Sequence, residues 1–249
     1  MIIPPTWNLP EAIRVRLGQS TYGRQRAIVE EGHLLLVLHK PPGPDDRGRE
    51  GVLFWRSPAG EWQCNRGGPG SGGLKRHVQS YVDIEGKLTQ DYEAASTNGE
   101  LFDLQETLTP LVRASRGMHN AMQAAREAIK QDAFIIEVRD LAYEVERNLD
   151  LLFEDVRNAI QQATAREAEV QARASKEALT ASHRLNILAA LFLPLTAITS
   201  LFGMNFTRGI DEHIPIMFWL VFAGGVTLGF VIKNWVTAKP KPPAVTRKQ

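Results

Sequence analysis

The pattern of apolar and polar positions changes character near residue 70. Before that point the chain carries short apolar or alternating runs, at 12–17, 33–40, 52–57 and 61–64. Segments rich in Gly and Pro lie between and after these runs, at 41–46 and 66–73. Short runs separated by such residues are typical of β-strands joined by turns. We therefore predict a small β-rich unit over residues 1–66, followed by a linker at 66–73.

From residue 74 onward the pattern becomes helical. We expect helices over 74–96 and 101–130, with a break at Asn98-Gly99. Residues 132–202 then contain no glycine, and Pro194 is their only proline. This run predicts one helix of about 70 residues, roughly 105 Å long at 1.5 Å per residue. A helix of that length is typical of a stalk or coiled coil.

The apolar positions of this long helix repeat every eleven residues. The stripe consists of Leu141, Val145, Leu149, Leu152, Val156, Ile160 and Ala163. A repeat of about 3.67 residues per turn favours a straight or slightly right-handed bundle. The same phase continues through Ser182, Leu185, Ala189, Leu193, Thr196 and Ser200. Two interpretations stay open: one continuous face that lines an axis from the cytoplasm to the exterior, or packing restricted to the apolar segment.

Two charge-free apolar runs lie near the C-terminus, Leu185–Phe202 and Ile214–Ile232. A bilayer core needs about 20 apolar residues, so both runs are long enough to be membrane spans. The first contains polar positions and Pro194, which in a span usually face protein or water. The second contains Gly225 and Gly229, whose spacing allows close approach to another helix. We predict that the first span lines a pore and the second shields it from lipid, and a pore then requires several copies of the chain.

Charge and cysteine content restrict the class of protein. The net charge of +1 indicates no nucleic-acid partner, and the single Cys64 excludes an internal disulfide. Basic residues flank the two apolar runs and are scarce between them. This distribution predicts that both termini are cytoplasmic and that residues 205–213 form an external loop. We expect no N-terminal signal peptide, because residues 1–18 lack a basic start and a long apolar run.

The most specific motif is Gly203-Met204-Asn205, directly after the first apolar run. The stretch RLNILAALFLPLTAITSLFGMNF (184–206) resembles the signature of the CorA family of divalent-cation (magnesium) transporters, a superfamily with a zinc-transporting branch. The resemblance implies a mostly α membrane protein with a small α/β N-terminal cytoplasmic domain. It also implies a long stalk helix continuous with the first of two C-terminal transmembrane helices, assembled as a homopentameric bundle in the inner (cytoplasmic) membrane.

The resemblance makes Gly203, Met204 and Asn205 the selectivity filter for a hydrated ion. A ring of Asn205 amide oxygens would accept hydrogen bonds from the waters that Mg²⁺ gives up reluctantly. The resemblance places Ser200, Thr196 and Leu193 along the pore, with Leu193 as an apolar constriction. Continuation of the stripe adds Ala189, Leu185 and Ser182 to the predicted pore-lining residues.

The loop after the motif contains Asp211 and Glu212, which would concentrate cations at the pore mouth. Arg208 in the same loop would oppose them, and ordinary solvated charge is an equal alternative. His213 beside these two acids is too little for a zinc site.

These observations predict four parts: the unit at 1–66, a helical cytoplasmic region at 67–184, a transmembrane hairpin at 185–236 and a basic tail at 237–249. The expected function is conduction of divalent cations, with Mg²⁺ as the expected ion, membrane lipid and other copies of the chain as partners, and no bound cofactor. A zinc- or cobalt-type transporter and a non-transporting structural or regulatory homologue remain alternatives. No catalytic or nucleotide-binding motif is visible, and the histidines are expected to be surface or satisfied residues, namely His33, His39, His77 and His119.

Overall fold

A computed structural model describes residues 3–18, 21–43, 48–203 and 215–237 of the 249. The chain divides into two compact units, Met1–Ala165 and Arg166–Gln249, which we call the N-terminal and C-terminal units. Helix α4 (Ala133–Gly203) contributes residues to both. The uninterrupted helix predicted from the lack of glycine is therefore confirmed, Pro194 included.

The N-terminal unit contains a four-stranded antiparallel sheet in the order β1-β2-β3-β4. Its strands are β1 (Arg26–Glu30), β2 (His33–His39), β3 (Gly51–Arg56) and β4 (Trp62–Cys64). The runs at 33–40, 52–57 and 61–64 were thus correctly predicted as strands, whereas β1 was missed. A two-residue turn joins β1 to β2, with positive φ at Glu31 (50°) and Gly32 (78°). Turns of that geometry match the twist of a hairpin.

The predicted strand at 12–17 is wrong. Residues Glu11–Val15 form helix α1, which starts after Pro10. Ile13 and Leu17 are buried while Val15 between them is 75 % exposed. In a strand these three alternate residues would share one face, but in a helix only positions four apart do. The sequence AIRVRL is therefore compatible with the two-residue period of a strand and with the 3.6-residue period of a helix. Burial of Ile13 and Leu17 against the sheet favours the helix.

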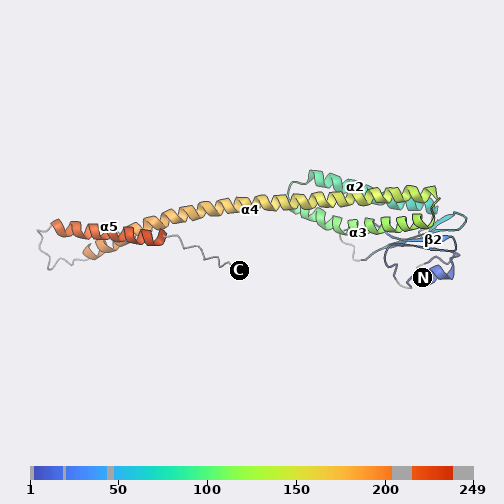
Figure 1. Ribbon diagram of the computed structural model, residues 1–249, viewed down its shortest axis with the longest axis horizontal. Helices are drawn as coiled ribbons and strands as arrows, with labels where there is room; N and C mark the ends of the chain where they lie inside the picture. The colour runs from blue at the N-terminus through green and yellow to red at the C-terminus, as the bar shows by residue number, and fades with distance from the viewer. Residues whose placement is uncertain (1–2, 19–20, 44–47, 204–214, 238–249) are drawn as a thin grey trace, which may run out of the picture. The chain divides into compact units, whose positions relative to one another are not determined.

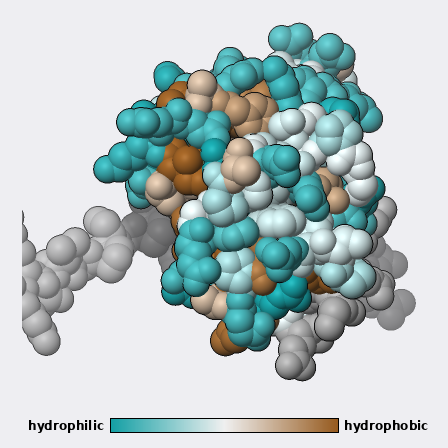
Figure 2. All heavy atoms as spheres, turned by 90° about the vertical axis from the view of Figure 1, so that its right-hand side faces the viewer, coloured by the Kyte–Doolittle hydropathy of each residue, from teal (hydrophilic) through white to brown (hydrophobic). Residues whose placement is uncertain are grey.

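Both faces of the sheet are covered, which explains why β2 reads as a continuous apolar run. One face packs against the N-terminal segment, through residues that include Trp7, Ile13 and Trp55. The other face packs against helices, with Phe54 in the same core as residues of α2, α3 and α4. Figure 1 shows these helices lying along the sheet. The surface at this end is mostly hydrophilic, with apolar residues in separate patches (Figure 2).

Helices α2 (Gly70–Ala94) and α3 (Asn98–Ala128) begin earlier than predicted. Residues 66–73 are not a simple linker, because α2 starts after Pro69 and uses the last glycines of the segment. The expected break at Asn98-Gly99 lies at 95–97 instead. There Thr97 and Glu100 form a capping box that starts α3. Asp132 caps α4, accepting hydrogen bonds from the backbone N–H groups of Phe134 (3.0 Å) and Ile135 (3.2 Å).

The apolar stripe of α4 is packed inside its own protomer. Val145, Leu149, Leu152 and Val156 are each 6 % exposed or less and belong to the helix–sheet core. This segment therefore lines no axis, and for it the restricted-packing interpretation is correct. By contrast, every residue from 164 to 186 is exposed.

In the C-terminal unit, α5 (Pro215–Thr237) lies beside the end of α4 (Figure 1). Among the described residues one helix is long and apolar enough to cross a membrane, in the segment Ala133–Ser200, with a mean hydropathy of 1.3 over its best window. The apolar stretch of α5 that the same search finds is the shorter Phe222–Val231.

Candidate functional site

The six predicted pore residues lie on one face of α4 and are all exposed within the protomer. The helix advances about 100° per residue. At that rate the five positions from 185 onward, Leu185, Ala189, Leu193, Thr196 and Ser200, fall within about 40° of a common direction. All five, and Ser182 before them, are exposed; Leu185 and Leu193 are each 66 % exposed. A free face with two large apolar side chains is unusual for a helix surrounded by water.

Helix α5 packs on the opposite side of α4. A Cβ added at Gly225 would lie 3.0 Å from Ile198 Cδ1 and 3.6 Å from Leu195 Cδ1. A Cβ added at Gly229 would lie 3.4 Å from the carbonyl oxygen of Leu191. The close approach predicted from the spacing of these glycines is therefore confirmed as a contact within the chain. At about 100° per residue, the contacted positions point roughly 120–180° away from the centre of the predicted pore face.

The threonines at this end of α4 direct their hydroxyl protons to the backbone. Thr196 Oγ1 donates to the carbonyl of Phe192 (2.8 Å), and Thr199 Oγ1 donates to that of Leu195 (3.0 Å). Such bonds satisfy a hydroxyl within its own helix. The oxygen lone pairs remain available as acceptors. Thr196 therefore presents to its surroundings a group suited to the waters around a cation.

The predicted selectivity motif is described only in part. Gly203 is the last residue of α4. The predicted filter residues Met204 and Asn205 and the loop acids Asp211 and Glu212 lie outside the described residues, as do Arg208 and His213.

A polar cluster joins α3 to α4 in the N-terminal unit. Arg116 Nη2 lies 2.9 Å from Asp150 Oδ2, and Arg116 Nε lies 3.3 Å from Glu146 Oε1. Glu146 also pairs with His119 Nδ1. These partners could not be predicted from local pattern, because they lie 27–34 positions apart in the chain. Within the described ranges, no group of three or more His, Cys, Asp or Glu side chains is arranged to hold a metal ion.

The histidines are only partly as expected. His39 is 5 % exposed and its Nε2 lies 2.9 Å from the carbonyl oxygen of Gly23. His33 Nδ1 accepts a hydrogen bond from Trp55 Nε1 (3.1 Å). His77 contradicts the expectation, because its buried Nε2 has no hydrogen-bond partner in the described part of the chain. Burial, with a smaller effect from the charge of Arg66, lowers the pKa of His77 to about 4.

Residues 79–237 match the sequence model of the family described as CorA-like Mg2+ transporter protein. The match covers more than half of the chain and includes all of α3, α4 and α5. The chain belongs to this family. The family consists of membrane proteins that transport divalent cations, and its members are transporters rather than enzymes.

Two solved structures are similar to this CorA-like chain. One is the complete structure of the CorA magnesium transporter from Methanocaldococcus jannaschii, with 14 % identity, a TM-score of 0.43, and coverage of 92 % of this chain and 82 % of that one. The other is the structure of the full-length CmaX protein, with 17 % identity, a TM-score of 0.47, and coverage of 93 % and 81 %. Both TM-scores lie below 0.5, so family membership rests on the sequence match. No curated protein matches the chain.

The family match begins at residue 79, inside α2, and therefore leaves out the sheet. The N-terminal unit thus combines CorA-like helices with strands that precede the matched region. The matched region contains the stretch 184–206, on which the resemblance was seen in the sequence.

Proposed function

We propose that this CorA-like protein conducts hydrated divalent cations, with Mg²⁺ as the expected ion, down their electrochemical gradient. The pore is lined by the end of α4 from each copy in a homopentamer. The observation that carries the proposal is the free face of α4 with Leu193, Thr196 and Ser200, which is turned away from α5. A helix whose one side is occupied by its own hairpin partner has only this face left for an axis.

Apolar and hydroxyl side chains follow one another along the proposed pore. Leu193 forms an apolar ring that closes by excluding water, and Thr196 and Ser200 form hydroxyl rings nearer the motif. Asn205 provides neutral amide oxygens at the mouth, with Gly203 allowing the backbone to turn and Met204 packing beside it. Neutral ligands hold a hydrated ion weakly enough to release it, as conduction requires. Asp211 and Glu212 raise the local cation concentration, against the charge of Arg208.

Helix α5 completes the proposed membrane hairpin and faces lipid. It has 23 residues, and exposed Trp219, Leu220 and Phe222 lie on its surface. With basic residues before residue 185 and after residue 232, both termini are placed in the cytoplasm and the 205–213 loop outside the inner membrane.

Ion flux into liposomes tests the proposal. The purified protein is reconstituted, and uptake of Mg²⁺, Zn²⁺, Co²⁺ and Ni²⁺ is measured separately. We expect Mg²⁺ uptake in the native protein and its loss in Asn205→Ala, because the filter then lacks its amide oxygens. Asn158→Ala, at an exposed position of the same helix, is the matched control and should retain full uptake.

Each other outcome has a defined meaning. Uptake of Zn²⁺ or Co²⁺ in preference to Mg²⁺ would move the protein to the zinc-type branch. Full selectivity in Asn205→Ala would remove the filter assignment. No uptake of any ion by folded, oligomeric protein would favour the structural or regulatory alternative.

Cysteine accessibility tests the assignment of the α4 face. In a Cys64→Ser background, single cysteines replace Ser182, Ala189, Thr196 or Ser200. A cysteine at Ala190, which is 9 % exposed and lies on the α5 side, is the control. We expect a small cationic thiol reagent to modify Thr196→Cys and to block its flux, because the reagent follows the ion path. Equal modification of Ala190→Cys would contradict the assignment.

A further inference from the structure

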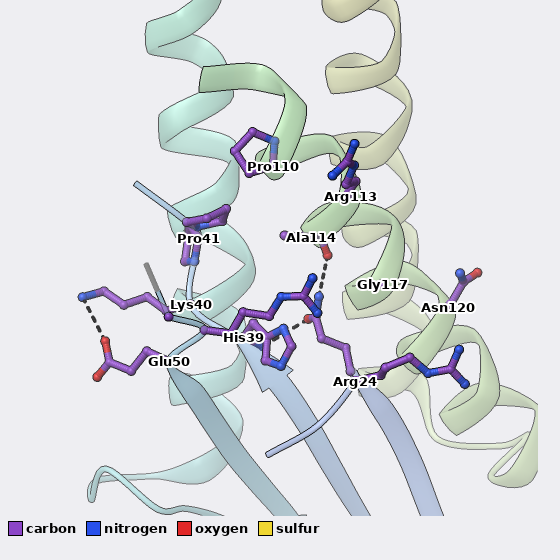
Figure 3. A pocket seen from close by; sticks show the side chains of 14 residues that line it. Arg24, His39, Lys40, Pro41, Glu50, Pro110, Arg113, Ala114, Gly117 and Asn120 are labelled. Atoms are coloured by element: carbon purple, nitrogen blue, oxygen red, sulfur yellow. Dashed lines mark hydrogen bonds and ion pairs between the residues drawn. The ribbon is translucent and has the colours of Figure 1, made fainter. Parts of the chain in front are cut away.

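A basic cavity lies at one end of the sheet in the N-terminal unit. Because neighbouring strands are antiparallel, β1 begins, β2 ends and β3 begins at this end. The lining comes from the residues flanking these strand ends and from one side of α3 (Figure 3). The cavity volume is about 510 Å³. Small-molecule sites commonly have volumes of roughly 300–1,000 Å³.

The cavity wall is strongly cationic. Arg24, Lys40, Arg49 and Arg113 all line it, and each comes from a different segment of the chain. Its only carboxylate among the described residues is Glu50, which forms ion pairs with Lys40 (3.5 Å) and Arg66. No hydrogen bond or ion pair to another described residue uses the side chains of Arg24, Arg49 or Arg113. These three charges therefore stabilise no contact in the described part of the fold.

The floor of the cavity is held by neutral groups instead. Gln25 Nε2 donates to the carbonyl of Ala114 on α3 (2.7 Å), and the backbone N–H of His39 donates to Gln25 Oε1 (3.1 Å). Gly117 makes this possible, because a Cβ there would lie 2.8 Å from Gln25 Nε2. One side chain thus joins α3 to the end of β2 beneath the arginines. These two bonds hold α3 and the end of β2 together at the floor before any ligand arrives.

The field inside the cavity is positive. His39, at its floor, is buried, and burial together with the charges of Arg49 and Arg26 lowers its pKa despite the hydrogen bond to Gly23. Neutral His39 adds no charge at pH 7, so the arginines and Lys40 determine the sign of the field. A site with this surplus of positive charge attracts anions.

Prolines form an apolar part of the remaining wall. Pro41, Pro42 and Pro110 line the cavity beside the cations, and Figure 3 shows Pro41 and Pro110 on the side of Lys40 and Arg113. Guanidinium groups match the oxygens of phosphate in pairs. A volume of about 510 Å³ exceeds what inorganic phosphate fills. We infer that this cavity binds an organic phosphate of nucleotide size, with its phosphates on Arg24, Arg49 and Arg113 and its organic part against the prolines.

Binding of ATP to the full-length protein in detergent tests this inference without any measurement of ion flux. Calorimetry is run in Mg²⁺-free buffer with a chelator, so that free ATP is the probe. We expect saturable binding that weakens as salt is raised. Arg24→Gln and Arg113→Gln should each weaken it by about tenfold, because each removes a charge-assisted contact. Arg126→Gln, also on α3 but outside the cavity, should bind as the native protein does.

Four results would overturn the inference. The first is equal affinity in Arg113→Gln and Arg126→Gln, and the second is equal affinity for ATP, citrate and inorganic phosphate. The third is binding to phosphatidylglycerol vesicles that ATP does not compete for, which would make the surface a lipid-headgroup site. The fourth is ATP binding only after Asp45→Asn and Asp46→Asn are introduced together. Those two acids precede Arg49 in the chain and lie outside the described residues, and such a result would mean that they neutralise the arginines in the native protein.

Discussion

The two halves of α4 have the same backbone structure and opposite surroundings. Between residues 135 and 156 its apolar side is buried in the core shared with α2, α3 and the sheet, with Leu149 and Val156 fully inaccessible. Between 164 and 186 every side chain is exposed, and beyond that only the side facing α5 is covered. One helix can therefore be a core element at its start and a free surface at its end.

This contrast shows what an eleven-residue repeat does and does not encode. The repeat keeps apolar positions in line along the helix, but it does not specify what they face. In the first half they face the protomer's own core. In the second half the same phase faces no described residue of the protomer, as expected of a surface reserved for other copies in the proposed pore. Long helical segments with no tertiary contact have little stability of their own.

The largest expected effect comes from truncating the packed half. Leu149→Ala should lower the free energy of unfolding by about 2–5 kcal/mol, because it leaves a cavity in a full core. Leu151→Ala, two residues away and 54 % exposed, is the matched control and should change it by less than about 1 kcal/mol. Chemical denaturation of the full-length protein measures both. Equal losses would mean that the two sides of this half are equally covered, and the contrast would fail.

The next effect is a dependence of stability on pH, which comes from His77 in the packed region. The pKa of His77 is about 4 in the folded protein and 6.5 without burial. As pH falls below about 6.5, the unfolded chain binds a proton that the folded protein refuses, so stability declines until about pH 4. The total loss is up to about 3 kcal/mol.

Two variants isolate this histidine. His77→Phe keeps a ring beside Phe54 and Tyr81 and should flatten the decline in unfolding temperature between pH 6.5 and 4. His183→Gln, at an exposed position in the C-terminal half of α4, should leave the decline unchanged. A decline of native size in His77→Phe would assign it to other groups.

The smallest effect concerns the contact between α4 and α5. Gly225→Leu should destabilise the protein by about 1–3 kcal/mol, because its side chain would collide with Ile198. Gly224→Leu should be nearly neutral, since a Cβ there meets nothing within 4 Å. Thermal unfolding in detergent compares the two. A greater loss in Gly224→Leu would mean that α5 presents its other side to α4.

Much of the fold could be predicted from local pattern. The long helix, the strands β2, β3 and β4 and the Gly225/Gly229 contact all follow from residues near one another in the chain. The segment 12–17 could not, because its alternation suits two periods and only burial of Ile13 with Leu17 distinguishes them. β1 was missed because RAIVE is short and ends in charges.

The sequence by itself determined the continuous course of α4, the phase of its apolar stripe and, through the match over residues 79–237, the family. These properties depend on spacing along one chain segment, which any reader of the sequence can measure. Only the tertiary structure decided which stretch of the stripe is buried and which face α5 leaves free, and only it brought four cations around one cavity. Those outcomes depend on contacts such as Gln25 with Ala114, 89 positions apart, and no local pattern records which distant residues meet.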